Sequence, residues 1–96
     1  MHKSHKLLES IGRLIMSSRA ISMDQTELGL RVGVGRNTIS AIENGKAVNA
    51  ETLFKVLEQL DLIDDFQLVI DEKLEGQTQH FSRKTRKVQP LLDNDF

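Results

Sequence analysis

A short set of polar and small residues between positions 36 and 41 is the part of the sequence best suited to recognition chemistry. It offers a guanidinium, a carboxamide, a hydroxyl and a methyl group, carried by Arg36, Asn37, Ser40 and Ala41. The edges of DNA bases present matching partners: guanine has acceptors that fit arginine, adenine has a donor and acceptor pair that fits asparagine, and thymine has a methyl group. We therefore expect these four residues to contact bases, if one rigid element presents them together.

Four amphipathic helices are expected to position this set. Apolar residues recur at intervals of three and four, which is the spacing of one face of an α-helix. The helices are predicted to run over about residues 5–18, from Gln25, from Arg36 and after Asn49. Their buried faces are Leu7, Leu8, Ile11, Leu14 and Ile15; Leu28 and Val32; Ile39 and Ile42; and Leu53, Val56, Leu57 and Leu60, with Phe54 at the edge.

Capping residues and glycines mark the ends of these helices. Asp24 is expected to cap the second helix with Glu27 in a capping box, Gly35 to cap the third and Asn49 the fourth. Gly33 and Gly45 follow helix ends, where a left-handed residue is common. Only residues 33–35 connect the second helix to the third, and so short a connection predicts a helix-turn-helix.

Four further residues border the outward face of the third helix, or lie at the start of the second, and are expected to contact the DNA backbone. These are Gln25, Thr38, Asn44 and Lys46. Gln25 lies in the first turn of its helix, where free N–H groups and the helix dipole favour a phosphate. Such contacts fix the register of a protein on DNA without reading its sequence.

The residues after Leu62 change in pattern. Phe66, Leu68 and Ile70 alternate with other residues, which predicts a β-strand over residues 63–72. A lone strand needs a partner, and we expect the same strand of a second copy to supply it in a homodimer. Such a dimer would bind a palindromic operator through two recognition helices about 34 to 36 Å apart. Residues 73–96 are predicted to form a flexible polar tail.

Composition excludes several other classes of protein. The chain has 96 residues, which suits one domain at residues 1–62 plus a short extension, and its net charge of -1 argues against indiscriminate binding to nucleic acid. It contains no cysteine, and no signal peptide or membrane span is recognisable, so we expect a cytoplasmic protein. A dinucleotide loop at Gly33 and Gly35 is ruled out, because Thr38 occupies the third glycine position and no strand precedes it.

No catalytic or cofactor site is recognisable either. His2, His5 and His80 do not group with carboxylates at a metal-binding spacing, and no activated nucleophile or acid and base pair can be named. We therefore expect no enzyme activity, no metal and no cofactor.

The segment "DQTELGLRVGVGRNTISAIENGK" resembles the helix-turn-helix of lambda-repressor-type (Xre) proteins, and the resemblance covers about residues 7–62. It implies a helical bundle whose third helix enters the major groove, with base contacts from the 36–41 set and a phosphate contact from Gln25. It also implies that a late arginine of the first helix, Arg19, pairs with Glu43. Asp24, Gly29 and Gly35 depart from the family pattern, where Thr, Ala and Ser or Thr are usual.

With the predicted strand, the expected fold is an all-α lambda-repressor-like bundle with one C-terminal β-strand pairing across a dimer. This combination resembles HipB-type antitoxins, which repress their own operon and bind a HipA-type serine/threonine kinase toxin. Two alternatives stay open: a stand-alone Xre-type repressor, and a protein-interaction module that has lost DNA binding.

Overall fold

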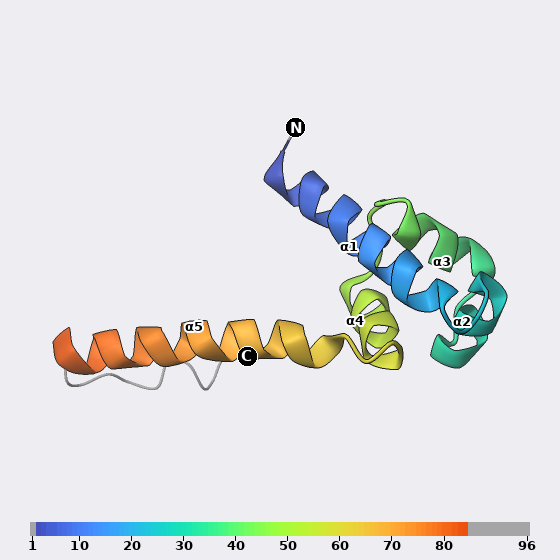
Figure 1. Cartoon of the computed structure of the whole chain (residues 1–96). Coiled ribbons are helices and arrows are strands. Elements are labelled where there is room, and N and C mark those ends of the chain that lie inside the picture. Colours follow the sequence, from blue (N-terminus) through green and yellow to red (C-terminus); the bar gives the residue numbers. More distant parts are fainter. Residues whose placement is uncertain (1, 85–96) are drawn as a thin grey trace. The chain divides into compact units, whose positions relative to one another are not determined.

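The computed structural model describes residues 2–84 (Figure 1). Within this range the chain is all-helical, with α1 (Lys3–Ala20), α2 (Gln25–Val32), α3 (Arg36–Glu43), α4 (Ala50–Gln59) and α5 (Ile63–Lys84). The chain separates into two compact units, of which the first ends at Asp64 and the second begins at Asp65. Helices α1 to α4 therefore form one unit, in the order that the sequence predicts.

The residues at both ends of these helices cap or terminate them, as their types suggest. The Asp24 carboxylate caps α2 by accepting a hydrogen bond from the N–H of Glu27 at 2.8 Å. Gly33 closes α2 with φ of 85°, a left-handed conformation that costs glycine little. The Asn49 side chain accepts from two N–H groups in the first turn of α4. In the expected capping box the Glu27 carboxylate would reach back to the start of α2. Instead, it pairs with Arg31 Nε at 2.9 Å.

The core of the first unit consists of six buried apolar side chains from all four helices: Ile15, Leu28, Ile39, Ile42, Val56 and Leu57. Leu7 and Leu14 were expected on the buried face of α1, but they are 59% and 40% exposed. Because Gly12 and Ile15 are the buried residues of α1, Leu7 and Leu14 lie on a neighbouring row of its surface, which faces solvent.

Two buried glycines let the backbone of α3 and its preceding turn approach other helices closely. A Cβ atom on Gly12 of α1 would lie 2.5 Å from the carbonyl oxygen of Ile42, at the end of α3. A Cβ atom on Gly29 of α2 would lie 2.6 Å from the carbonyl oxygen of Val34, in the turn. Gly29 therefore permits the turn to pack directly against α2.

The predicted strand over residues 63–72 is wrong, because these residues begin the long helix α5. Phe66, Ile70 and Leu74 follow one another at intervals of four, so that the apolar residues fit a helix as well as an alternating strand. Two aspartates in the first turn favour a helix start, and no glycine or proline interrupts the segment before Gly76. The expected pairing of Phe66, Leu68 and Ile70 across a dimer as a strand is wrong for the same reason.

Helix α5 also replaces part of the predicted tail. Residues 73–84 form its second half, whereas residues 85–96 lie outside the described residues. In the described part of the chain, no helix combines the length and the apolar character needed to cross a membrane.

Candidate nucleic-acid interface

Helix α3 presents the predicted base-contacting residues on the side opposite its core residues. Ile39 and Ile42 are buried, while Arg36 and Asn37 are exposed in the first turn. Ser40 and Ala41 continue this face one turn later and are half-buried: Ser40 is four residues after Arg36, and Ala41 four after Asn37. The structure thus gathers the four residues on one rigid helix with a guanidinium and a carboxamide accessible at its N-terminal end.

The predicted backbone-contacting residues of α3 and its following loop have different surroundings. Lys46 is exposed just after the left-handed Gly45, and Thr38 is half-buried on the flank of α3. Asn44 is exposed, but its Nδ2 donates a hydrogen bond to the carbonyl oxygen of Ser40 at 2.9 Å. The same carbonyl also accepts from the backbone N–H of Asn44 at 3.0 Å, so the side chain adds a second bond at the C-terminal end of α3, a contact that the sequence does not predict.

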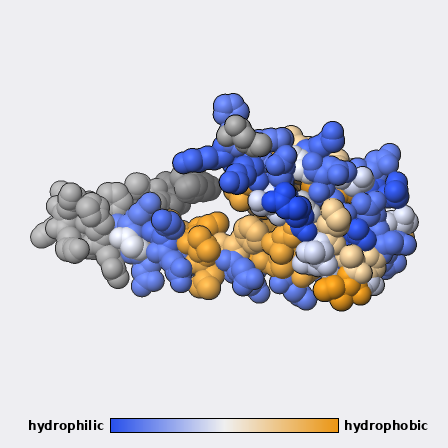
Figure 2. All heavy atoms as spheres, turned by 45° about the horizontal axis from the view of Figure 1, so that its top comes forward, coloured by the Kyte–Doolittle hydropathy of each residue, from blue (hydrophilic) through white to orange (hydrophobic). Residues whose placement is uncertain are grey.

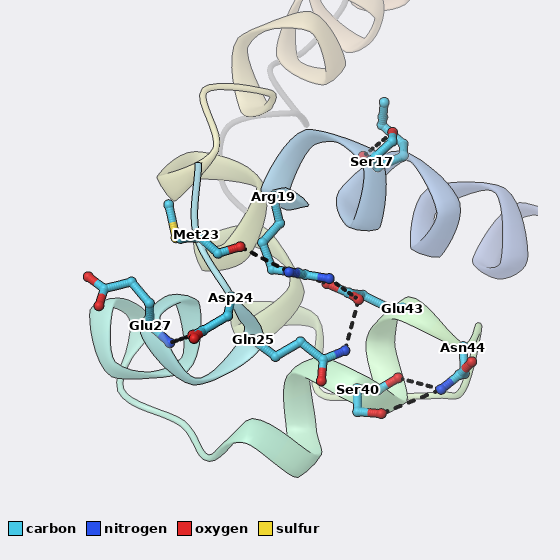
Figure 3. A network of polar contacts seen from close by, with 10 residues as sticks. Ser17, Arg19, Met23, Asp24, Gln25, Glu27, Ser40, Glu43 and Asn44 are labelled. Carbon is cyan, nitrogen blue, oxygen red and sulfur yellow. Dashed lines mark hydrogen bonds and ion pairs between the residues drawn. The ribbon is translucent and has the colours of Figure 1, made fainter. Parts of the chain in front are cut away.

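Gln25 begins α2, as predicted, and its carboxamide is already engaged. Its Nε2 donates a hydrogen bond to Glu43 Oε1 at 2.9 Å (Figure 3). The Gln25 side chain is half-buried and reaches across from the start of α2 to the last residue of α3. Gln25 has two amide hydrogens, so one remains for a phosphate oxygen.

Glu43 also accepts two hydrogen bonds from Arg19, which confirms the pairing that the resemblance implies. Arg19 Nε lies 2.6 Å from Glu43 Oε2, and Nη2 lies 3.1 Å from Oε1. The Glu43 side chain is 2% exposed and that of Arg19 is 13% exposed. A third bond joins Arg19 Nη1 to the carbonyl oxygen of Met23 at 3.0 Å, which ties the loop before α2 to α1. A buried charge of this kind needs a bidentate partner, and Arg19 supplies it.

The electrostatic surroundings keep Arg19 charged. Hydrogen bonding to Glu43 is the largest cause that raises the pKa of the Arg19 guanidinium, and burial opposes it. The negative charges of Glu43 and Asp24 raise this pKa further.

Sequence reasoning did not find the contact between Gln25 and Glu43. Both residues had been assigned roles separately, one as a phosphate ligand and one as the partner of Arg19. The sequence offers no local signal for this contact, because the short turn joins the end of α2 to the start of α3 and leaves the distance between their other ends to helix packing.

Metal-binding clusters are not found among the described residues. His5 pairs with Glu9 at 3.3 Å within α1, and His2 is exposed at the helix start. The side chain of His80 lies outside the described part of the structure.

Comparison with known proteins agrees with this geometry. Residues 19–64 match a family model described as helix-turn-helix, a range that begins at Arg19 and includes α2, α3 and α4. Neither the curated proteins nor the solved structures give a match to the chain. The lambda-repressor-type (Xre) resemblance is therefore confirmed at the level of the helix-turn-helix, and such a domain indicates a DNA-binding transcription regulator.

Proposed function

We propose that this protein is a sequence-specific DNA-binding repressor of the cytoplasm, which acts by binding and not by catalysis. The observation that carries the proposal is the exposure of Arg36 and Asn37 in the first turn of the second helix of a helix-turn-helix. That turn is where a major-groove helix presents its base-reading side chains. Ser40 and Ala41 extend the reading surface, and Lys46, Thr38 and Gln25 supply backbone contacts.

Of the two kinds of repressor considered, the structure supports neither over the other. The resemblance to HipB-type antitoxins depended on a strand over residues 63–72, and α5 occupies these residues. Without that strand, no feature of the described residues distinguishes an antitoxin with a HipA-type kinase partner from other lambda-repressor-type regulators. We therefore base the proposal on operator binding alone.

We further propose that two copies pair through α5. Val69, Ile70 and Leu74 are 56%, 52% and 46% exposed, and with Phe66 they lie on one side of this helix. Figure 2 shows apolar side chains of α5 gathered on the visible surface. A helix of this kind gains its stability from covering its apolar face, and a second copy offers an identical face across a two-fold axis.

The charge of residues 63–78, the part of α5 that carries this face, argues against DNA as its cover. Between residues 63 and 78 its sequence holds Asp64, Asp65, Asp71, Glu72 and Glu75, against Lys73 as its one basic residue. Acidic side chains repel phosphates, so α5 is suited to a protein partner. A dimer would place two α3 helices on successive turns of a palindromic operator.

A salt titration of binding to the promoter of the protein's own gene tests the proposed function. Phosphate contacts release counterions, so we expect the affinity to fall steeply with salt and to exceed that for a scrambled duplex at every salt concentration. Equal affinity for both duplexes, or no binding to either, would instead support a protein-interaction module that has lost DNA binding.

A further inference from the structure

Glu43 lies where three helices meet and contacts a residue from each of the other two. Its carboxylate accepts hydrogen bonds from Arg19 at the end of α1 and from Gln25 at the start of α2, and Glu43 itself is the last residue of α3 (Figure 3). One oxygen, Oε1, receives both Arg19 Nη2 at 3.1 Å and Gln25 Nε2 at 2.9 Å. A carboxylate has about four acceptor positions, so the bond from Gln25 satisfies one of them and at the same time fixes the Gln25 side chain.

The chemistry of the carboxylate fixes the direction of the Gln25 carboxamide. An ionised carboxylate can only accept hydrogen bonds, so the NH2 group of Gln25 must face Glu43 and its carbonyl oxygen must point away. Figure 3 shows this oxygen directed away from Glu43. The bond also holds a side chain that would otherwise rotate about three torsions, and leaves one N–H free.

We propose that Glu43 is a positioning residue for DNA binding, which holds the Gln25 carboxamide ready to donate its second N–H to an operator phosphate. The inference rests on the proposed function, because it requires a bound duplex. Since Glu43 belongs to α3, it fixes the phosphate contact of Gln25 relative to the base-reading face of the same helix. Arg19 supports this role by neutralising the buried charge at 2.6 Å.

The test measures the contribution of single phosphates to affinity. The probe is the duplex that the wild-type protein selects from a random pool, made with one neutral methylphosphonate at a time. Wild type is expected to lose affinity about tenfold at one phosphate in each half-site, the size expected for a hydrogen bond to a charged group. Gln25→Met, which keeps the length of the side chain and removes the amide, is expected to be insensitive at that phosphate.

Glu43→Gln is the decisive variant. The substituted side chain has a single acceptor oxygen, for which Arg19 and Gln25 compete. Because Arg19 is charged, it forms the stronger hydrogen bond, and the Gln25 carboxamide loses the bond that holds it. We expect Glu43→Gln to become insensitive at the Gln25 phosphate while it keeps wild-type sensitivity at other phosphates and the same base preference. Glu27→Gln makes the same change in the exposed pair with Arg31 and is expected to retain the wild-type profile.

Several outcomes overturn the inference. An even loss of affinity by Glu43→Gln at all phosphates would assign Glu43 a structural role only, and full sensitivity at the Gln25 phosphate would show that the amide needs no support. A Gln25→Met profile equal to that of wild type would remove the phosphate contact itself. If wild type selects no duplex, the proposed function fails and the inference fails with it.

A measurement on the wild-type protein tests the inference if Glu43→Gln does not fold. The two side-chain amide protons of Gln25 can be followed by NMR, with exposed Gln77 as the reference. We expect one proton to exchange slowly in the free protein and the other to shift when the duplex is added. Exchange of both protons as fast as in Gln77, or no shift on adding the duplex, would contradict a supported amide.

Discussion

Arg36 is the side chain on which base recognition most directly depends. Its guanidinium is exposed in the first turn of α3, and it can form two hydrogen bonds with guanine. We expect Arg36→Ala to weaken operator binding by about 1–3 kcal/mol and to relax base choice at one position in each half-site. Arg31→Ala, which removes an exposed arginine paired with Glu27 on α2, is expected to leave base choice unchanged. Uniform weakening over all sequences by Arg36→Ala would rule out a base contact.

The buried pair of Arg19 and Glu43 is the residue-scale determinant of stability. Removing one partner of a buried ion pair leaves a charge without compensation, so we expect Glu43→Ala to lower the free energy of unfolding by about 3–5 kcal/mol. Glu51→Ala removes an exposed carboxylate 3.8 Å from Lys55 and is expected to cost about 0.5 kcal/mol or less. Urea unfolding followed by circular dichroism measures both. Equal losses for the two variants would contradict a buried role for Glu43.

The contribution of Arg19 to stability depends on pH in one direction only. Because the pKa of Arg19 is raised in the folded state, its contribution is complete below the ordinary pKa of a guanidinium. The contribution is lost only as the pH rises through the folded-state pKa in strongly alkaline solution. Arg19 therefore supplies no pH dependence of stability at neutral or acidic pH.

At the scale of elements, the turn between α2 and α3 depends on the absence of a side chain at Gly29. A methyl group there would lie 2.6 Å from the Val34 carbonyl oxygen, so the turn would have to move. We expect Gly29→Ala to destabilise the first unit by about 1–3 kcal/mol, as overpacking does. Thermal unfolding measures the effect.

Gly76→Ala is the matched control for this change. It introduces the same methyl group into a helix with no atom within 4 Å, and it is expected to increase the helical content of α5 because alanine favours helix more than glycine does. A stability gain from Gly29→Ala would contradict the close approach of the turn.

The sequence predicted α1 to α4 because caps and helical spacing agreed there. Asp24, Gly33 and Asn49 each mark an end by a local hydrogen bond or a left-handed backbone, which a single sequence reveals. Helix α5 was missed because five alternating residues, from Phe66 to Ile70, are too short a window to separate a period of two from a helical period. The contact between Gln25 and Glu43 was missed because it joins residues 18 positions apart, where only the packing of two helices decides the distance.

At the scale of the whole molecule, the proposed dimer depends on which residues of α5 share a face. Ile70 lies with Phe66 and Leu74, whereas Leu68 lies on the opposite side of a helix, although the two are similarly exposed at 52% and 56%. We expect Ile70→Lys to produce monomers and Leu68→Lys to leave the dimer intact, measured by analytical ultracentrifugation. A strand would place both residues on one face, so dissociation of the dimer by both variants would contradict pairing through a helix. A monomeric wild-type protein would contradict the dimer itself.

The claim that α3 reads bases in the major groove is tested most directly by methylation interference. Dimethyl sulfate methylates guanine N7, which faces the major groove, and adenine N3, which faces the minor groove. On the duplex that wild type selects, we predict that methylation of one guanine N7 in each half-site blocks binding, and that Arg36→Ala is indifferent to the same guanine. Interference only at adenine N3, or none at all, would contradict the claim.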